Sequence, residues 1–217
     1  FAFPISRQLP LMGGSQSGAH VNAVFENLLP DNTDLRRRIA ERTEARSDRP
    51  HDLLAAIGRD CIGAMQFLPR GGNPGDPFRI EGAPQSEAEI AATIRDLATS
   101  PLGMRADDTF RISIAGAQEK TAFLWHDGAW LKPAGLTPTT HIFKRRMGVV
   151  SHGIDMTDSV EIEWLCLKLA AAMGLPVNDA RIATFEDQTV LVVTRFDRAP
   201  REKGGINPSG ALRVQFD

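Results

Sequence analysis

The chain has 217 residues, of which 42% are hydrophobic and 24% charged, and its formal net charge at pH 7 is -2. This length and apolar content allow one substantial core or two small ones. The nearly balanced charge gives no electrostatic case for direct contact with nucleic acid.

The cysteines and the lack of long apolar runs set the expected compartment. Cys61 and Cys166 have no metal-ligand spacing, and no apolar run approaches about 18 residues. Neither a signal peptide nor a lipidation motif is found. We therefore expect a cytoplasmic protein with no membrane partner. The start at Phe1 and the end at Asp217, just after a strand-like run, indicate a piece of a longer polypeptide.

The first hundred residues predict four helices separated by turn signals. Apolar residues at three- and four-residue spacing predict a helix over residues 21–28, which Pro30 ends. Ser86 and Glu89 have the spacing of a capping box. The other predicted elements are helices from residue 33, over 52–57 and over 86–97, a strand over 62–68 and a loop over 70–77.

The stretch ISIAGAQEKT, residues 112–121, places a serine, a turn of small residues and a Glu-Lys pair between two strand-like runs. Alternation of apolar and polar residues predicts strands over 110–114 and 121–125. Small side chains at residues 115–117 let backbone N–H groups approach an anion closely, as phosphate-binding loops require. The stretch favours a phosphate-binding loop, although a single glycine in a hairpin also marks an ordinary turn.

A lysine-bearing strand and a glutamate-bearing helix follow. The strand over 140–144 ends in Lys144, and the helix from Asp158 to its stop at Gly174 carries Glu163. Kinases hold nucleotide phosphates with a strand lysine that a helix carboxylate orients. This order favours a Lys144–Glu163 pair, and the alternative is an exposed flank glutamate. The expected cap is Asp158 with Glu161, and the expected apolar stripe is Val160, Trp164, Leu167 and Ala171.

The last predicted element is a hairpin of strands over 180–185 and 189–194, which continues into Arg195-Phe196-Asp197-Arg198. Other chemistries are not supported. The five histidines are scattered, with no Cys or carboxylate at ligand spacing, so we assign no metal site. The sequence has no GxSxG, GxGxxG or GxxxxGK[ST] string.

Three long strings carry a family resemblance. ISIAGAQEKTAFL, PTTHIFK and VVTRFDR occur in that order, and ENLLPD and DLLAAIGRDCIGAM precede them. Together they resemble the HipA family of bacterial toxin serine/threonine kinases, over about residues 25–198 and over only part of the family's length. The resemblance implies an α+β fold, with a HipA-type N-terminal subdomain over 1–105. A kinase-like small lobe, a twisted antiparallel sheet with one main helix, would cover 106–217.

The resemblance also implies the site residues. Ser113 would be an autophosphorylation site whose modification expels the loop, the alternative being a strand serine that points to solvent. Glu163 would orient Lys144, and Phe196 would lie by the adenine or in the core. The family often has an acidic residue where Thr194 stands, which puts one polar contact in doubt. The implied nucleotide-binding residues are Ala115, Gly116, Ala117, Gln118, Glu119, Lys120 and Lys144, with Val193, Thr194 and Phe196 around the base.

The implied activity is phosphorylation of a protein serine or threonine with ATP and Mg²⁺. The family's catalytic and metal-binding strings, resembling DGHAKN and YD, do not occur in this sequence. We therefore assign no catalytic residue and expect the chain alone to be inactive. The resemblance implies glutamyl-tRNA synthetase as the target, and growth arrest and persistence as the outcome. It also implies a HipB-like DNA-binding antitoxin as the partner, and the chain would contact DNA only through this antitoxin. Two alternatives stay open: a non-catalytic remnant that binds antitoxin in operon autorepression, and a kinase-like enzyme acting on a small molecule.

Overall fold

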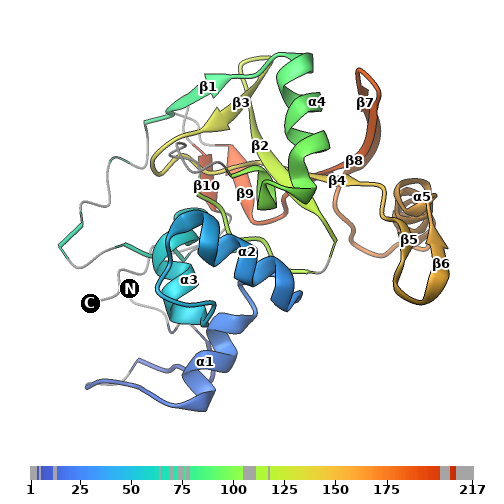
Figure 1. The fold of residues 1–217 in the computed structure, drawn as a ribbon. Coiled ribbons are helices and arrows are strands. Elements are labelled where there is room, and N and C mark those ends of the chain that lie inside the picture. The colour runs from blue at the N-terminus through green and yellow to red at the C-terminus, as the bar shows by residue number, and fades with distance from the viewer. Residues whose placement is uncertain are drawn as a thin grey trace.

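The computed structural model describes residues 4, 6–11, 14–63, 65–68, 71–72, 76, 79–104, 111–116, 118–200 and 206–208. Three helices come first, followed by an antiparallel sheet with a helix on each face (Figure 1). This is the α+β arrangement that the sequence predicts. The helices are α1 (Ala19–Glu26), α2 (Thr33–Thr43), α3 (Pro50–Ile57), α4 (Glu87–Arg95) and α5 (Ser159–Ala172), with 3₁₀ turns at Asp96–Ala98, Pro101–Gly103 and Ser151–Gly153.

We call α1, α2 and α3 the N-terminal helical unit. The Asn32 side chain accepts a hydrogen bond from the N–H of Leu35 at 3.0 Å and so caps α2. Glu44, in the left-handed region at φ 54°, ends that helix. Pro50 starts α3, where its missing N–H costs no hydrogen bond. The unit buries one apolar cluster, which includes Leu29, Leu35, Ile39, Leu53, Leu54 and Ile57.

The main sheet has six strands in the order β1-β3-β2-β4-β8-β7, with every neighbour antiparallel. Asp127 and Gly128, both at positive φ, make the two-residue turn between β2 and β3. Glu186, also at positive φ, turns β7 into β8. The strands are β1 (Gly82–Pro84), β2 (Lys120–His126), β3 (Ala129–Pro133), β4 (His141–Arg145), β7 (Ala180–Phe185) and β8 (Gln188–Thr194). Two small hairpins are β5 (Gly148–Val150) with β6 (Ile154–Met156), and β9 (Arg198–Pro200) with β10 (Ile206–Pro208).

Each face of the sheet has its own core. On one face, α4 packs Ile90 and Ile94 against Phe123 and Phe143. The other face is shared, because Ala122 joins the core of the N-terminal helical unit. On that same face, α5 packs Val160 against Leu191 and Val193. The N-terminal helical unit and α5 therefore flank the surface on which Lys120 and Lys144 lie.

The boundary predicted near residue 105 stays a prediction. The strand β1 and the helix α4 lie before it, yet β1 pairs with β3 and α4 packs on the sheet. Within the described residues, no helix is both long and apolar enough to cross a membrane.

Two predicted strands do not form. Ile112, Ser113 and Ile114 are all buried and belong to no strand, because the segment runs between the N-terminal helical unit and the sheet. The described residues of 62–68 contain only a bridge at Met65. Phe110 and most of the predicted loop over 70–77 lie outside the described residues.

Two details of α5 were also predicted wrongly. The Asp158 side chain makes no capping hydrogen bond, and Glu161 pairs instead with Arg146. Ala171 is exposed. The buried stripe is therefore limited to Val160, with Trp164 and Leu167 packed partly against it.

Candidate functional site

Two lysines lie side by side on neighbouring strands, on the same face of the sheet. Lys120 of β2 is the register partner of Lys144 of β4, so their side chains leave the same face as close neighbours. The Lys144 ammonium lies 2.5 Å from a carboxylate oxygen of Glu163. This is the pair that the sequence favours, and α5 brings it about, because Val160 anchors the start of that helix to the sheet.

The Lys144–Glu163 pair orients more than it stabilises. Its side chains are 24% and 34% exposed, and partly solvated ion pairs contribute only about 0–1 kcal/mol. The pair does fix the direction of a long, flexible ammonium group. A cation held in this way is suited to contact phosphate oxygens.

Within the described part of the chain, the Lys120 ammonium has no carboxylate in direct contact, unlike that of Lys144. It is only 5% exposed, and its ammonium donates to the carbonyl of Ala115 at 2.5 Å. Burial, and next the charge of Lys144, lower the pKa of Lys120 to about 8, while Asp31 and Glu163 oppose the shift. An anion bound beside the two ammonium groups would favour the charged form of Lys120.

The loop before β2 is tied to β4. The Gln118 amide donates to the carbonyl of Arg145 at 2.7 Å, and Glu119 pairs with the Arg145 guanidinium at 3.2 Å. Gly116 has a φ of 103°, and a Cβ there would lie 2.7 Å from the Lys120 ammonium, so glycine suits this position. Ala117 lies outside the described residues. A pocket of about 180 Å³ opens beside the loop, lined by Gln118, Glu119, Arg145, Arg146, Met147 and Val150.

Ser113 does not point to solvent. Its side chain is fully buried, its hydroxyl donates to the carbonyl of Leu28 at 2.5 Å, and its N–H donates to the carbonyl of Asp60 at 3.1 Å. The alternative of a solvent-facing strand serine is therefore wrong. A kinase can reach this hydroxyl only if the segment leaves its site.

The end of β8 places the residues expected near adenine. Val193 is buried on the face of the sheet that α5 covers, Thr194 is half-buried, and Phe196 is 72% exposed. The core alternative for Phe196 is thus wrong. The N–H groups of Thr194 and Arg195 already donate to Asp179 at 2.8 Å and Thr140 at 2.9 Å. Contact of this segment with a base stays a prediction, and these two amides cannot donate to a base without breaking those bonds.

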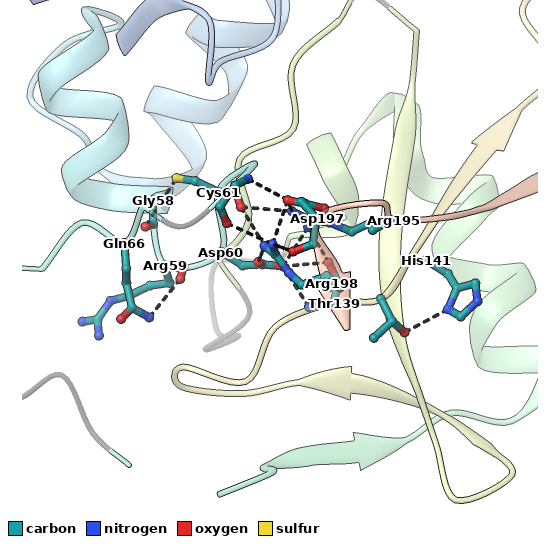
Figure 2. A network of polar contacts seen from close by, with 12 residues as sticks. Gly58, Arg59, Asp60, Cys61, Gln66, Thr139, His141, Arg195, Asp197 and Arg198 are labelled. Atoms are coloured by element: carbon teal, nitrogen blue, oxygen red, sulfur yellow. Dashed lines mark hydrogen bonds and ion pairs between the residues drawn. The ribbon is translucent and has the colours of Figure 1, made fainter. Parts of the chain in front are cut away.

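The sequence analysis did not predict a buried ionic cluster that joins the segment after β8 to Asp60, which follows α3 (Figure 2). Arg195 lies 3.2 Å from Asp60 and 2.8 Å from Asp197, and Arg198 lies 2.6 Å and 2.7 Å from the same two carboxylates. Thr139 completes it, its N–H and hydroxyl donating to Asp60 at 2.9 Å and 2.7 Å. We call these five residues the Asp60 cluster. The only sign of this cluster in the sequence is that three charged residues, Arg195, Asp197 and Arg198, directly follow a buried strand.

Burial and charge oppose each other at the carboxylates. Burial alone raises the pKa of Asp60, but the charges of Arg195 and Arg198 outweigh it and hold that pKa below its ordinary value. Asp197 behaves in the same way: burial raises its pKa, while the hydrogen bond and charge of Arg195 lower it further. Both aspartates are therefore ionised at neutral pH.

Comparisons with known proteins match both halves of the chain. The model of the HipA N-terminal domain matches residues 2–68, and that of the HipA-like C-terminal domain matches residues 112–216. A kinase candidate of Sinorhizobium fredii, Y4mE, is 30% identical over 206 residues. The serine/threonine-protein kinase toxin HipA of Shewanella oneidensis is 29% identical over 197 residues.

The chain spans less than half of these relatives. The matches cover 94% and 90% of this chain but 47% of Y4mE and 42% of the Shewanella toxin. A solved complex of Shewanella oneidensis HipA, HipB and operator DNA contains a similar chain, with a TM-score of 0.66 and 28% identity. That similarity covers 92% of this chain and 44% of the other.

Proposed function

Because this chain belongs to the HipA family, we propose that it forms the nucleotide-holding part of an ATP-dependent serine/threonine protein kinase, the toxin of a toxin-antitoxin system. The Lys144–Glu163 pair carries the proposal. It joins a strand lysine to a helix carboxylate at 2.5 Å, which is the arrangement protein kinases use to hold nucleotide phosphates.

The residues present fit the phosphates of ATP. Lys144, oriented by Glu163, supplies one cation, and Lys120 on the neighbouring strand supplies a second. Glu119, a carboxylate in the loop, is paired with Arg145 and so repels phosphate less. When bound, ATP supplies the phosphoryl group, with Mg²⁺ to offset its charge. Among the described residues, no cluster of His, Cys, Asp or Glu is arranged to hold a metal ion, so we assign no Mg²⁺ ligand here.

The partner and the target are proposals from the family. A HipB-like antitoxin is the proposed partner, since the similar solved chain is in a complex of HipA, HipB and operator DNA. The net charge of -2 gives no electrostatic case for direct contact with DNA, so we propose contact only through that partner. Glutamyl-tRNA synthetase as target, and persistence as outcome, rest on the resemblance alone.

Lys144→Ala tests the proposal in the gene product that carries these 217 residues. We expect the variant to lose ATP binding and kinase activity, because it removes the oriented phosphate contact. Its melting temperature should stay within a few degrees of the parent, since the lost pair is partly solvated. Arg37→Ala, which removes a cation from an exposed pair with Asp34, is the matched control and should retain activity.

The outcomes of this test separate the alternatives. Normal activity in Lys144→Ala would remove the assignment of this lysine. No ATP binding by the parent would instead favour a non-catalytic module that binds antitoxin. Transfer of phosphate to small alcohols or aminoglycosides and not to protein would favour a small-molecule kinase.

We also expect the 217 residues alone to transfer no phosphate. The sequence lacks strings resembling DGHAKN and YD, so the acid that positions the acceptor hydroxyl is not provided. The purified chain, incubated with labelled ATP, Mg²⁺ and glutamyl-tRNA synthetase, should give background labelling. Strong labelling would mean that catalytic residues lie within these 217 positions.

A further inference from the structure

In the Asp60 cluster, the buried charges of two arginines and two aspartates balance one another. Two guanidiniums and two carboxylates each contact both opposite charges, so the formal charges cancel. The four side chains are between 2% and 7% exposed. Buried ion pairs of this kind gain little net stability over apolar packing, because desolvation offsets the attraction. Their geometric effect is larger. The Arg195 guanidinium binds both carboxylate oxygens of Asp197, and the Arg198 guanidinium bridges Asp197 and Asp60, so the bonds fix direction as well as distance.

The cluster joins segments that are far apart in sequence. Asp60 follows α3 of the N-terminal helical unit, whereas Arg195 and Arg198 follow β8, 135 and 138 positions later. Arg195 and Arg198 also donate to the carbonyl of Cys61, at 3.0 Å and 2.7 Å. The Asp197 carboxylate accepts from the N–H of Gly63 at 2.6 Å. Figure 2 shows Asp60 and Cys61, which follow α3, beside Arg195, Asp197 and Arg198 of the segment after β8.

Asp60 also contacts both elements that lead to the lysines. Its backbone carbonyl accepts from the N–H of Ser113, three positions before Gly116. Its side chain accepts from Thr139, two positions before β4, the strand that carries Lys144. Asp60, three residues after the end of α3, thus contacts the loop before β2, the entry to β4 and, through the arginines, the segment after β8.

We propose that Asp60 is a positioning residue of the nucleotide site, through which the N-terminal helical unit sets the relative placement of the loop, β4 and the segment after β8. The inference rests on the proposed nucleotide binding. It gives the helical unit a part in that site although none of its own side chains is assigned a contact with nucleotide. Loss of the Asp60 charge would leave two buried guanidiniums sharing the Asp197 carboxylate, and all three segments would shift together.

The test is nucleotide affinity of the folded protein. We would titrate ATP into the gene product as parent and as Asp60→Asn, at a temperature well below the melting point of each, with circular dichroism confirming folding. A residue that only stabilises the fold would lower the melting temperature and leave the affinity of the folded protein unchanged. We expect Asp60→Asn to bind ATP at least tenfold more weakly. Asp34→Asn, the same change in an exposed pair, should bind like the parent.

A second variant keeps the test decisive if Asp60→Asn fails to fold. Thr139→Val keeps the shape but removes the hydroxyl that donates to Asp60 and accepts from Arg195 at 2.8 Å. We expect a smaller loss of affinity, of about threefold or more. Unchanged affinity in folded Thr139→Val, or in folded Asp60→Asn, would overturn the proposal.

Hydrogen exchange separates this proposal from the proposed function. In Thr139→Val, the amides of Ser113, Thr139 and Arg195 should exchange faster together, although they lie far apart in sequence. This readout needs no nucleotide. If the parent binds no ATP, the proposed function fails, and coupled exchange then still supports the placement of the three segments by the Asp60 cluster. Faster exchange at Thr139 alone would contradict that role.

Discussion

At the scale of single residues, the two lysines differ in what surrounds them. Lys144 has a carboxylate partner, and its direction follows from Glu163. Lys120 is nearly inaccessible and donates to a carbonyl, so its protonated form is stabilised less. The sequence predicted the first partnership from strand, loop and helix order. It gave no sign of the second, because burial of a lysine at a strand start depends on elements that pack over it.

The lowered pKa of Lys120 predicts how nucleotide affinity depends on pH. Burial, chiefly, lowers this pKa to about 8, and a bound phosphate would raise it again. Below pH 8 the lysine is already protonated, so its contribution is constant. Above pH 8 binding must take up a proton, and affinity should fall by up to about tenfold per pH unit. Calorimetric titrations of ATP between pH 7 and 9.5 measure this.

Lys120→Arg is the control, because a guanidinium stays charged over this range. Its affinity profile should be flat, and an equally steep profile would assign the pH dependence to another group. Stability of the unliganded protein should change in the opposite sense. The pKa of Lys120 is lower in the folded state than the ordinary lysine value of 10.5. The unfolded chain therefore holds more protons between about pH 8 and 10.5, and this residue adds stability as pH rises through that window.

At the scale of elements, the sequence predicted correctly those features that depend on residues close together in the chain. The Ser86–Glu89 capping box is present as predicted, since it depends on residues a few positions apart. The strand predicted over 110–114 failed for the opposite reason. Its alternation suggests one buried face, yet the N-terminal helical unit covers the other side too and buries Ser113. The partners of that serine, Leu28 and Asp60, lie 85 and 53 positions earlier.

The Ser113 segment gives an element-scale prediction. A phosphate on Ser113 adds about -1.5 to -2 charge, and a fully buried hydroxyl leaves no room for it. Phosphorylated protein should therefore release the segment and lose ATP affinity by tenfold or more, about 1.4 kcal/mol. Ser113→Ala should keep ATP binding and kinase activity and become more toxic. It should cost only about 1 kcal/mol of stability, from the lost bond to Leu28.

Calorimetric titration of ATP into the phosphorylated and unmodified forms measures the difference. Ser100→Ala, at another buried serine outside the proposed site, controls for loss of a hydroxyl. Equal affinities in the phosphorylated and unmodified forms would show that Ser113 does not regulate nucleotide binding.

At the scale of the whole molecule, the two regions matched by different HipA domain models share a core. Leu29 and Leu53, within residues 2–68, cluster with Ile112, Ile114 and Ala122, within residues 112–216. The Asp60 cluster spans the same two regions. The sequence indicated a boundary near residue 105, because the predicted helices give way there to a strand-rich part. It could not show that side chains from both sides would pack together, since such contacts have no local pattern.

Shared packing predicts that the chain unfolds as one cooperative unit. The three tryptophans, Trp125, Trp130 and Trp164, all follow residue 105, so their fluorescence reports the sheet and α5. Leu53→Ala, in the fully buried core of α3, should destabilise the chain by about 2–5 kcal/mol. In denaturant titrations the tryptophan transition should therefore shift with the helical signal of circular dichroism. A variant whose helical signal moved while its tryptophan transition stayed in place would show that the boundary near residue 105 separates two independently folding units.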